Sequence, residues 1–291
     1  MPFGRNSKIA DYFSLVKINH TIFSLPFALI GFFLATKSPD HDLSIRVLIL
    51  VLLCVVFARN AAMGFNRYAD RDIDKKNPRT ALREIPSEII SPKSALIFII
   101  INAGLFIITS YLLNFLCFLL SPVALVVILG YSLTKRFTWL SHIFLGMGLA
   151  LAPIGAYLAV TARFELLPLI YSFIVLFWVA GFDILYSLQD IEFDRSERLK
   201  SLPARLGRTK ALILSSLFHF IALVLVAAGG IVGDFNFLYW IGAAIFAILL
   251  CYEHIIVKPT DISRVNLAFA TMNGMASVIF ACFVIADLYL K

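Results

Sequence analysis

The stretch SIRVLILVLLCVVFARNAAMGFNRYADRDIDKK (residues 44–76) joins a long apolar run to a cluster of charged residues. Residues 44–65 are long enough to cross a membrane as a helix, which needs about 20 apolar residues. The run is continuously apolar rather than alternating, which favours a helix over a barrel strand. The stretch therefore predicts a transmembrane helix that leads directly into a polar segment.

The rest of the chain repeats this apolar character. Of its 291 residues, 60% are hydrophobic and 15% are charged, whereas a soluble domain carries roughly a quarter charged residues. We predict an all-α integral membrane protein, a single domain over residues 1–291 with nine transmembrane helices. Because only Asn114 divides the third span from the fourth, eight or ten spans remain possible. The nine spans are at about 19–36, 44–65, 93–112, 114–132, 139–160, 166–187, 210–232, 235–257 and 265–290.

The charge distribution predicts the orientation in the membrane. With nine spans and a cytoplasmic N-terminus, 20 of the 25 Lys and Arg residues fall on one side. This positive-inside asymmetry predicts a cytoplasmic N-terminus and cytoplasmic loops, and it explains the net charge of +7 without a nucleic-acid partner. The four cysteines lie in apolar runs without paired spacing, so we expect no disulfide or zinc site. Nothing in the sequence indicates an obligate protein partner.

Two long polar loops, residues 66–92 and 188–209, resemble each other. The first contains DRDIDK (Asp70–Lys75) and the second DIEFDR (Asp190–Arg195), 120 residues later. Each motif follows an apolar span and precedes a basic stretch. An internal duplication explains this match, and it predicts two pseudo-repeated halves that face each other across a central cavity.

Helical spacing indicates which acids share a face. Residues four apart stack on one side of a helix, so Asn66, Asp70 and Asp74 form one polar stripe. Asp72 lies two residues off that stripe and is expected to point elsewhere. The matching stripe of the second loop consists of Asp183, Tyr186 or Ser187, Asp190 and Asp194, with Glu192 off it.

Four aspartates that converge on one cavity repel each other unless cations are present. Carboxylate oxygens suit Mg²⁺, which is usually completed by substrate phosphates rather than by an all-protein cage. We therefore predict a diphosphate that Mg²⁺ bridges to both aspartate pairs, with basic side chains neutralising the remaining phosphate charge. The alternative is that the acids only solvate the loops. The nearby basic residues are Arg67, Arg71, Lys75, Arg79, Lys135, Arg136 and Arg195.

Two further ionisable residues lie within or near the spans. Arg59 is seven residues before Asn66, on the same face and deeper in the membrane, where charged groups usually line a cavity or find partners. The alternative for Arg59 is that it snorkels to the interface. His142 is near a predicted helix end, where we expect an interfacial histidine rather than a catalytic one.

These motifs resemble those of a known family. NRYADRDIDKKNPRT (Asn66–Thr80) resembles the first aspartate motif of the UbiA superfamily of intramembrane prenyltransferases, and DILYSLQDIEFD (Asp183–Asp194) resembles the second. YSLTKRFT (Tyr131–Thr138) resembles the tyrosine-lysine segment between them. The resemblance covers essentially the whole chain. It implies nine helices around a cavity that opens sideways to lipid, and Mg²⁺-dependent transfer of a polyprenyl group from its diphosphate.

The resemblance also implies roles for single residues. Lys135 and Arg79 fall on basic positions that the family uses at the diphosphate. Arg59 matches an arginine that similar enzymes direct at the aromatic acceptor, and Tyr131 matches a tyrosine that faces the reacting carbon. Asn66, Asp70, Asp74, Asp190 and Asp194 match the residues that bind the diphosphate and Mg²⁺. Arg67, Arg136 and Asp183 complete the expected substrate-binding set.

The implied reaction is prenylation of an aromatic acid such as 4-hydroxybenzoate in quinone biosynthesis. The chain departs from family members that act on 4-hydroxybenzoate: it has REIP at Arg83–Pro86 instead of RPLP, and Ser141-His142 instead of proline-glutamine. These changes are closer to a bacterial UbiA-like branch, some of which act on dihydroxynaphthoate in menaquinone synthesis. Two other classes stay open, a membrane CDP-alcohol phosphotransferase and an ion transporter.

Overall fold

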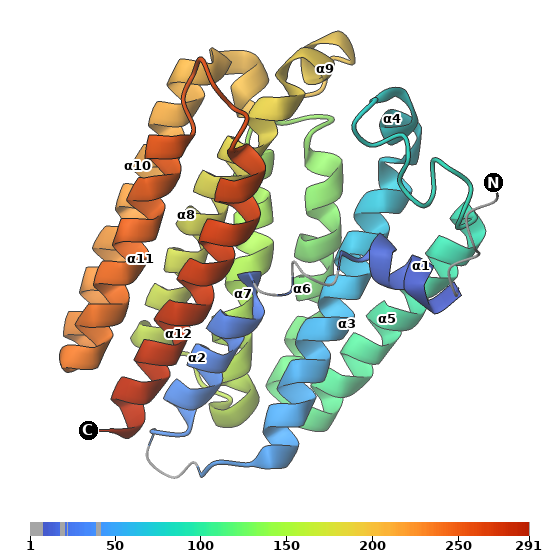
Figure 1. Ribbon diagram of the computed structural model, residues 1–291. Helices are drawn as coiled ribbons and strands as arrows, with labels where there is room; N and C mark the ends of the chain where they lie inside the picture. The colour runs from blue at the N-terminus through green and yellow to red at the C-terminus, as the bar shows by residue number, and fades with distance from the viewer. Residues whose placement is uncertain (1–7, 18–20, 22, 39–41, 291) are drawn as a thin grey trace.

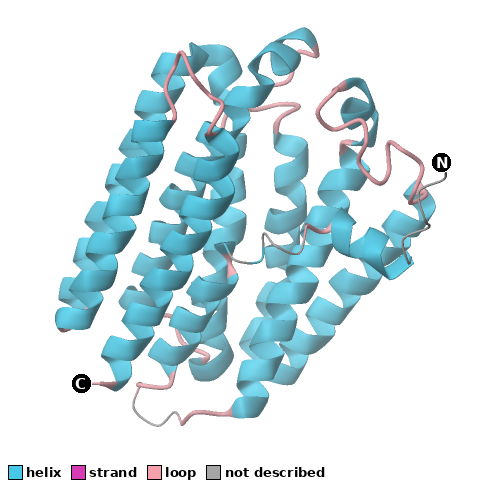
Figure 2. Ribbon diagram, in the orientation of Figure 1, coloured by secondary structure: helices cyan, strands magenta, loops and turns pink. Residues whose placement is uncertain are grey.

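The computed structural model describes residues 8–17, 21, 23–38 and 42–290, and its regular elements are helices, with no strand among these residues (Figures 1 and 2). Eight helical segments are long and apolar enough to cross a membrane. They are α3 (Ile45–Ala69), α5 (Pro92–Leu113), α6 (Phe115–Thr134), α7 (Ser141–Thr161), α8 (Leu166–Ser187) with its continuation η2 (Leu188–Asp190) and α9 (Ile191–Ser196), α10 (Leu202–Val232), α11 (Phe237–Ile256), and the π-helical η3 (Leu267–Met272) with α12 (Asn273–Tyr289).

The count of nine spans is not confirmed. The segment expected to be the first span contains α2 (Leu25–Ala35), which has 11 residues. A helix of that length is about 16 Å long, whereas a bilayer core is about 30 Å thick. Residues 19, 20 and 22 of the expected span lie outside the described residues. Hydropathy detects the apolar run at this position but does not tell how much of it is helical.

The division at Asn114 is confirmed, and the structure gives its cause. The backbone of Asn114 is extended (φ −165°, ψ 168°), which ends α5 and begins α6. Its Oδ1 atom accepts a hydrogen bond of 2.9 Å from the Cys117 backbone N–H, and its Nδ2 atom donates one of 2.8 Å to the Leu158 carbonyl. Asn114 thus caps α6 at its N-terminus and ties it to α7.

Helices α7 and α8 form the centre of the bundle, and α8 is the most deeply buried span (Figure 1). Small residues let the helices approach closely: a Cβ atom on Gly31 would lie 2.0 Å from the Pro153 carbonyl oxygen, and one on Gly146 would lie 2.4 Å from that of Leu176. The core between α2, α8, α11 and α12 is aromatic and includes Phe27, Trp178, Phe182, Phe246 and Phe280.

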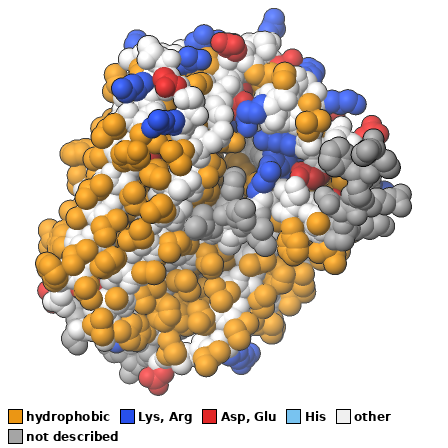
Figure 3. Space-filling model, viewed as in Figure 1, with side chains coloured by type: hydrophobic (Ala, Val, Ile, Leu, Met, Phe, Trp, Pro, Cys, Tyr) orange, Lys and Arg blue, Asp and Glu red, His pale blue; other side chains and the backbone are white. Residues whose placement is uncertain are grey.

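The outer surface separates into an apolar band and a charged end. Figure 3 shows hydrophobic side chains over the length of the helices, whereas most Lys, Arg, Asp and Glu side chains of this face lie at the end that carries α9 and α4 (Arg71–Lys76). This distribution, together with the eight spans, identifies an integral membrane protein. The side of the membrane that the charged end faces stays a prediction.

A buried carboxylate stabilises the opposite end of the bundle. Asp287 of α12 is 2% exposed, and it accepts hydrogen bonds from the backbone N–H groups of Asn236 (2.8 Å) and Tyr239 (3.2 Å) at the start of α11. We expect Asp287→Ala to destabilise the protein by about 1.5–3 kcal/mol, because one buried and one partly buried backbone N–H group lose a charged acceptor. The measurement is thermal unfolding in detergent.

The matched control is Asp287→Asn, which keeps one acceptor oxygen and should lose less stability than Asp287→Ala. Equal melting temperatures for the wild type and Asp287→Ala would contradict the capping role.

Candidate active site

The two acid motifs have the same local backbone structure. Helix α3 ends at Ala69, the chain bends at Asp70 (φ −94°, ψ 6°), and the six-residue α4 carries Asp74. Likewise α8 and η2 end at Asp190 (φ −102°, ψ 4°), and the six-residue α9 carries Asp194. In each motif a membrane helix thus delivers one aspartate at a bend and a second one turn later. Duplication of the two whole halves stays a prediction.

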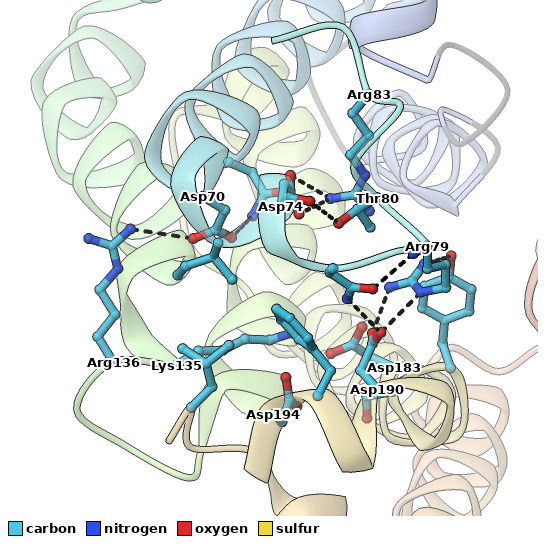
Figure 4. Close-up of a pocket in the computed structure, with 17 residues that line it drawn as sticks. Asp70, Asp74, Arg79, Thr80, Arg83, Lys135, Arg136, Asp183, Asp190 and Asp194 are labelled. Atoms are coloured by element: carbon cyan, nitrogen blue, oxygen red, sulfur yellow. Dashed lines mark hydrogen bonds and ion pairs between the residues drawn. The ribbon is translucent and has the colours of Figure 1, made fainter. Parts of the chain in front are cut away.

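Both motifs line a single cavity of about 170 Å³ at the charged end of the bundle (Figure 4). Nine of the twelve predicted site residues line it: Asn66, Asp70, Asp74, Arg79, Lys135, Arg136, Asp183, Asp190 and Asp194. The helical stripes are also as expected, because Asp74 is 5% and Asp194 is 2% exposed. In contrast, the Asp72 side chain is 81% exposed, and Glu192 is exposed as well.

Three of the aspartates form ion pairs with arginines. Arg79 contacts Asp190 through two hydrogen bonds, from Nε to Oδ1 (3.0 Å) and from Nη2 to Oδ2 (2.6 Å). Arg83 donates from Nη1 to both oxygens of Asp74 (2.7 and 2.8 Å). Arg136 lies 3.4 Å from Oδ1 of Asp70. The cavity is lined by five carboxylates and four cations, so its charges nearly cancel.

Lys135 is the cation that the acids share. Burial alone would lower the pKa of Lys135, but the carboxylates of Asp194, Asp183, Asp190 and Asp70 raise it above its ordinary value. Burial also raises the pKa of Asp70, which Lys135 and Arg136 oppose. Lys135 therefore stays protonated and stabilises negative charge in the cavity.

The donor atoms fit a hard divalent cation that shares its coordination with a phosphate. Among the described residues, no three His, Cys, Asp or Glu side chains are grouped closely enough to hold a metal by themselves. However, the Oδ2 atom of Asp194 is buried and has no hydrogen-bond partner in the described part of the chain, and carboxylate oxygens of both motifs face the same cavity. Oxygen donors that need further ligands are what Mg²⁺ uses beside substrate phosphates. The residues that would hold it are Asp70, Asp74, Asp190 and Asp194, with Asn66 beside them.

Three predicted site residues do not line this cavity. Arg59 lies deeper on α3 and donates a hydrogen bond of 2.7 Å from Nη2 to the Lys17 carbonyl. Arg67 is 5% exposed, and its Nε atom has no hydrogen-bond partner within residues 8–17, 21, 23–38 and 42–290. Tyr131 lies on α6 one turn before Lys135 and is half-buried. Their predicted roles toward the substrates stay predictions.

The structure also shows two cavity residues that were not among the predicted site residues, Arg83 and Asn77. Tyr186 and Ser187 of the second stripe line the cavity as well, and the Tyr186 hydroxyl accepts a hydrogen bond of 3.1 Å from Arg79. The expectation that His142 is interfacial is wrong: its side chain is fully buried and contacts Asp183. Of Arg83 and Asn77, only Arg83 had a signal in the sequence, since it is a basic residue that follows Asp74 by nine positions in the same loop.

Comparisons with known proteins agree with this geometry. The chain is 29% identical to the 4-hydroxybenzoate octaprenyltransferase of Aliivibrio fischeri (strain MJ11), over 97% of this chain and 98% of that protein. It is 28% identical to the protein of the same name from Francisella tularensis subsp. novicida (strain U112), over 96% of this chain and 98% of that protein.

Two solved structures have the same fold. A UbiA homologue from Aeropyrum pernix K1, in its apo form, superposes with a TM-score of 0.80 at 31% identity, over 94% of this chain and 98% of that one. A UbiA homologue from Archaeoglobus fulgidus bound to GPP and Mg²⁺ superposes with a TM-score of 0.70 at 21% identity, over 96% and 99%. The model of the UbiA prenyltransferase family matches residues 24–277, and the chain therefore belongs to the UbiA prenyltransferase family.

Proposed function

We propose that the protein transfers a polyprenyl group from polyprenyl diphosphate to an aromatic acid such as 4-hydroxybenzoate, with Mg²⁺, in quinone biosynthesis. The observation that carries the proposal is the convergence of both acid motifs and four cations on one cavity. The relatives named 4-hydroxybenzoate octaprenyltransferase and the homologue bound to GPP and Mg²⁺ support the same substrates. We place the protein in the bacterial inner membrane with this cavity on the cytoplasmic side.

The cavity residues would act on the leaving diphosphate. Arg79, Lys135 and Arg136 present cations to the cavity, and these can accept phosphate oxygens when the arginines exchange their aspartate partners. Mg²⁺, when bound, would draw charge from the diphosphate as the bond to the prenyl carbon breaks. The cavity is therefore preorganised for charge that grows on the leaving group, which is usually the largest contribution to catalysis of this kind.

The acceptor would attack from the membrane side of the cavity. When the C1–O bond of the prenyl diphosphate breaks, an allylic cation forms, and an electron-rich ring carbon beside a phenol hydroxyl attacks it. The apolar helix faces below the cavity would accommodate the isoprenoid tail. The position of the acids at the ends of α3 and α8 also argues against an ion transporter, whose acids would lie within the spans.

The deciding experiment uses purified protein, labelled prenyl diphosphate, Mg²⁺ and a panel of aromatic acids. The proposal expects a prenylated product with 4-hydroxybenzoate and no product when EDTA is added. A product with dihydroxynaphthoate alone would instead indicate that the protein acts in menaquinone synthesis. No prenylated product with any acceptor would overturn the proposed function.

Arg59 tests where the acceptor carboxylate binds. A guanidinium can hold a carboxylate through two parallel hydrogen bonds, which an ammonium cannot do. We expect Arg59→Lys to raise the KM for the aromatic acid and to leave the KM for prenyl diphosphate nearly unchanged. Arg59→Ala should have a larger effect, about 1.5–3 kcal/mol for a lost hydrogen bond to a charged group. The measurement is steady-state kinetics with each substrate varied in turn.

The contact with the Lys17 carbonyl gives the alternative outcome. If Arg59 only fastens the N-terminal segment, both substitutions should lower the melting temperature and leave both KM values unchanged. A raised KM for the diphosphate would instead place Arg59 in the phosphate site.

A further inference from the structure

A buried histidine supports one carboxylate of the cavity. His142, in the first turn of α7, is fully buried, and its Nδ1 atom lies 2.6 Å from Oδ2 of Asp183 on α8. The Asp183 side chain is 19% exposed and lines the cavity together with the two aspartate pairs (Figure 4). The contact joins residues 41 positions apart, and the proposed function has given neither of them a role in the chemistry.

Asp183 differs from the aspartates that pair with arginine. Asp70, Asp74 and Asp190 each contact a guanidinium, and hydrogen bonds reach both carboxylate oxygens of each of them. Asp183 contacts an imidazole instead, through Oδ2, and no hydrogen bond to its Oδ1 atom is found among the described residues. Asp183 therefore keeps one oxygen available to accept a proton, which the other three do not.

The surroundings of His142 indicate which nitrogen carries the hydrogen. Its Nε2 atom is buried and has no hydrogen-bond partner among the described residues. A hydrogen on Nε2 would be an unsatisfied buried donor, which is costly. The neutral tautomer with its hydrogen on Nδ1 avoids this cost and donates to Asp183. His142 therefore acts as a neutral donor that fixes Oδ2 and leaves Oδ1 available to the cavity.

The position of Asp183 along α8 also places it on the membrane side of the two aspartate pairs. It lies seven residues before Asp190, which is about 10 Å along a helix and toward the membrane interior. The two aspartate pairs are at the charged end, where the diphosphate would bind. Asp183 therefore lies on the side of the diphosphate site from which the prenyl carbon and the acceptor ring would approach.

We propose that Asp183 accepts the proton that the acceptor ring loses, and that His142 is the positioning residue that orients Asp183. This step rests on the proposed function. As the C1–O bond breaks, the diphosphate leaves with the electron pair, and the ring carbon forms the new C–C bond. The attacked ring carbon then gives its proton to Asp183, the C–H electron pair restores aromaticity, and Asp183 passes the proton to the departing diphosphate.

The test compares Asp183→Asn, His142→Asn and His142→Leu with the wild type. Asn at position 142 keeps a donor near the place of Nδ1, whereas Leu has the same size and no donor. We expect kcat to fall about 100-fold or more in Asp183→Asn, the lower end of what a general base contributes. His142→Leu should lose about 10- to 100-fold through misplacement of Asp183, and His142→Asn should recover most of that loss. The KM for prenyl diphosphate should stay the same in all three.

A second measurement separates proton removal from structural support. With 4-hydroxybenzoate deuterated at the two carbons beside the hydroxyl, Asp183→Asn should turn over more slowly than with the protiated acid, because loss of the ring proton becomes rate-limiting. Size-exclusion profiles and melting temperatures check that each variant is folded.

The outcomes distinguish this assignment from the proposed function. Suppose that the wild type prenylates an aromatic acid. If Asp183→Asn then has the wild-type kcat, or has a lowered kcat without an isotope effect, Asp183 is not the base. If His142→Asn and His142→Leu lose the same activity, the donor on His142 has no role. If the wild type prenylates no aromatic acid at all, the proposed function fails and this assignment fails with it.

Discussion

Asp194→Asn should lower turnover by about 10³-fold while the melting temperature stays the same or rises. Asp194 would help to hold the metal that stabilises the leaving diphosphate, and loss of one such electrostatic contact costs about 10²- to 10³-fold. Its Oδ2 atom is buried and has no hydrogen-bond partner among the residues that the structure describes, which is unfavourable for a carboxylate. Removal of the charge should therefore lower turnover and at the same time relieve a cost to stability. The measurements are steady-state rates at several Mg²⁺ concentrations and thermal unfolding in detergent.

The control lies on the same short helix. Glu192 is exposed two residues before Asp194, so Glu192→Gln removes a charge from α9 without entering the cavity and should keep the wild-type rate. Asp72→Asn is the same control on α4. If Asp194→Asn retains wild-type turnover, or if Glu192→Gln loses as much, the assignment of the metal ligands is refuted.

Arg83→Met should destabilise the protein by about 3 kcal/mol. The Asp74 side chain is 8% exposed and that of Arg83 is 23% exposed, so removal of the guanidinium leaves a buried carboxylate without its partner. Loss of one partner from a buried pair costs about 3–5 kcal/mol, and the partial exposure of Arg83 favours the lower value. The second substitution Asp74→Asn should restore most of the stability of Arg83→Met, because no uncompensated charge then remains. Unfolding of the wild type, Arg83→Met, Asp74→Asn and the double variant in detergent gives the coupling energy between Arg83 and Asp74 directly.

The same loop provides a matched exposed pair. Arg71 lies 3.6 Å from Asp72, whose side chain is 81% exposed, so water screens this contact. Arg71→Met should change the free energy of unfolding by less than about 1 kcal/mol. If Arg71→Met and Arg83→Met lower the free energy of unfolding equally, burial of the Arg83–Asp74 pair adds nothing to its contribution to stability.

The sequence was sufficient for the parts of the site that depend on local spacing. Asp74 and Asp194 are buried whereas Asp72 and Glu192 are exposed, because helical periodicity decides which side chains share a face. The break at Asn114 was also visible, since a polar N-cap residue between two apolar runs favours a new helix. The resemblance to the UbiA family is confirmed by the family match, and with it the expectation of a prenyl-transferring enzyme.

The sequence was insufficient where contacts join distant segments. His142 was expected at the interface because it begins a helix, but α7 and α8 pack so closely that it contacts Asp183 instead. The partner of Asp190 is Arg79, 111 residues away, and spacing alone does not identify such a pair. The first expected span is not confirmed for another reason, since hydropathy measures how apolar a run is and not where its helix begins.

In the proposed substrate complex, the arginine partners of Asp70, Asp74 and Asp190 would make binding of the divalent cation and binding of the diphosphate depend on each other. A divalent cation alone would have to displace an arginine from its carboxylate, and a phosphate alone would have to draw an arginine away from its aspartate. When both arrive together, each half of an ion pair gains a new partner of opposite charge. Binding should therefore be cooperative, and linkage requires each ligand to raise the affinity for the other by the same factor. Without a diphosphate, the enzyme would therefore bind the free divalent cations of the cell weakly, and it would bind a cation tightly only together with the diphosphate.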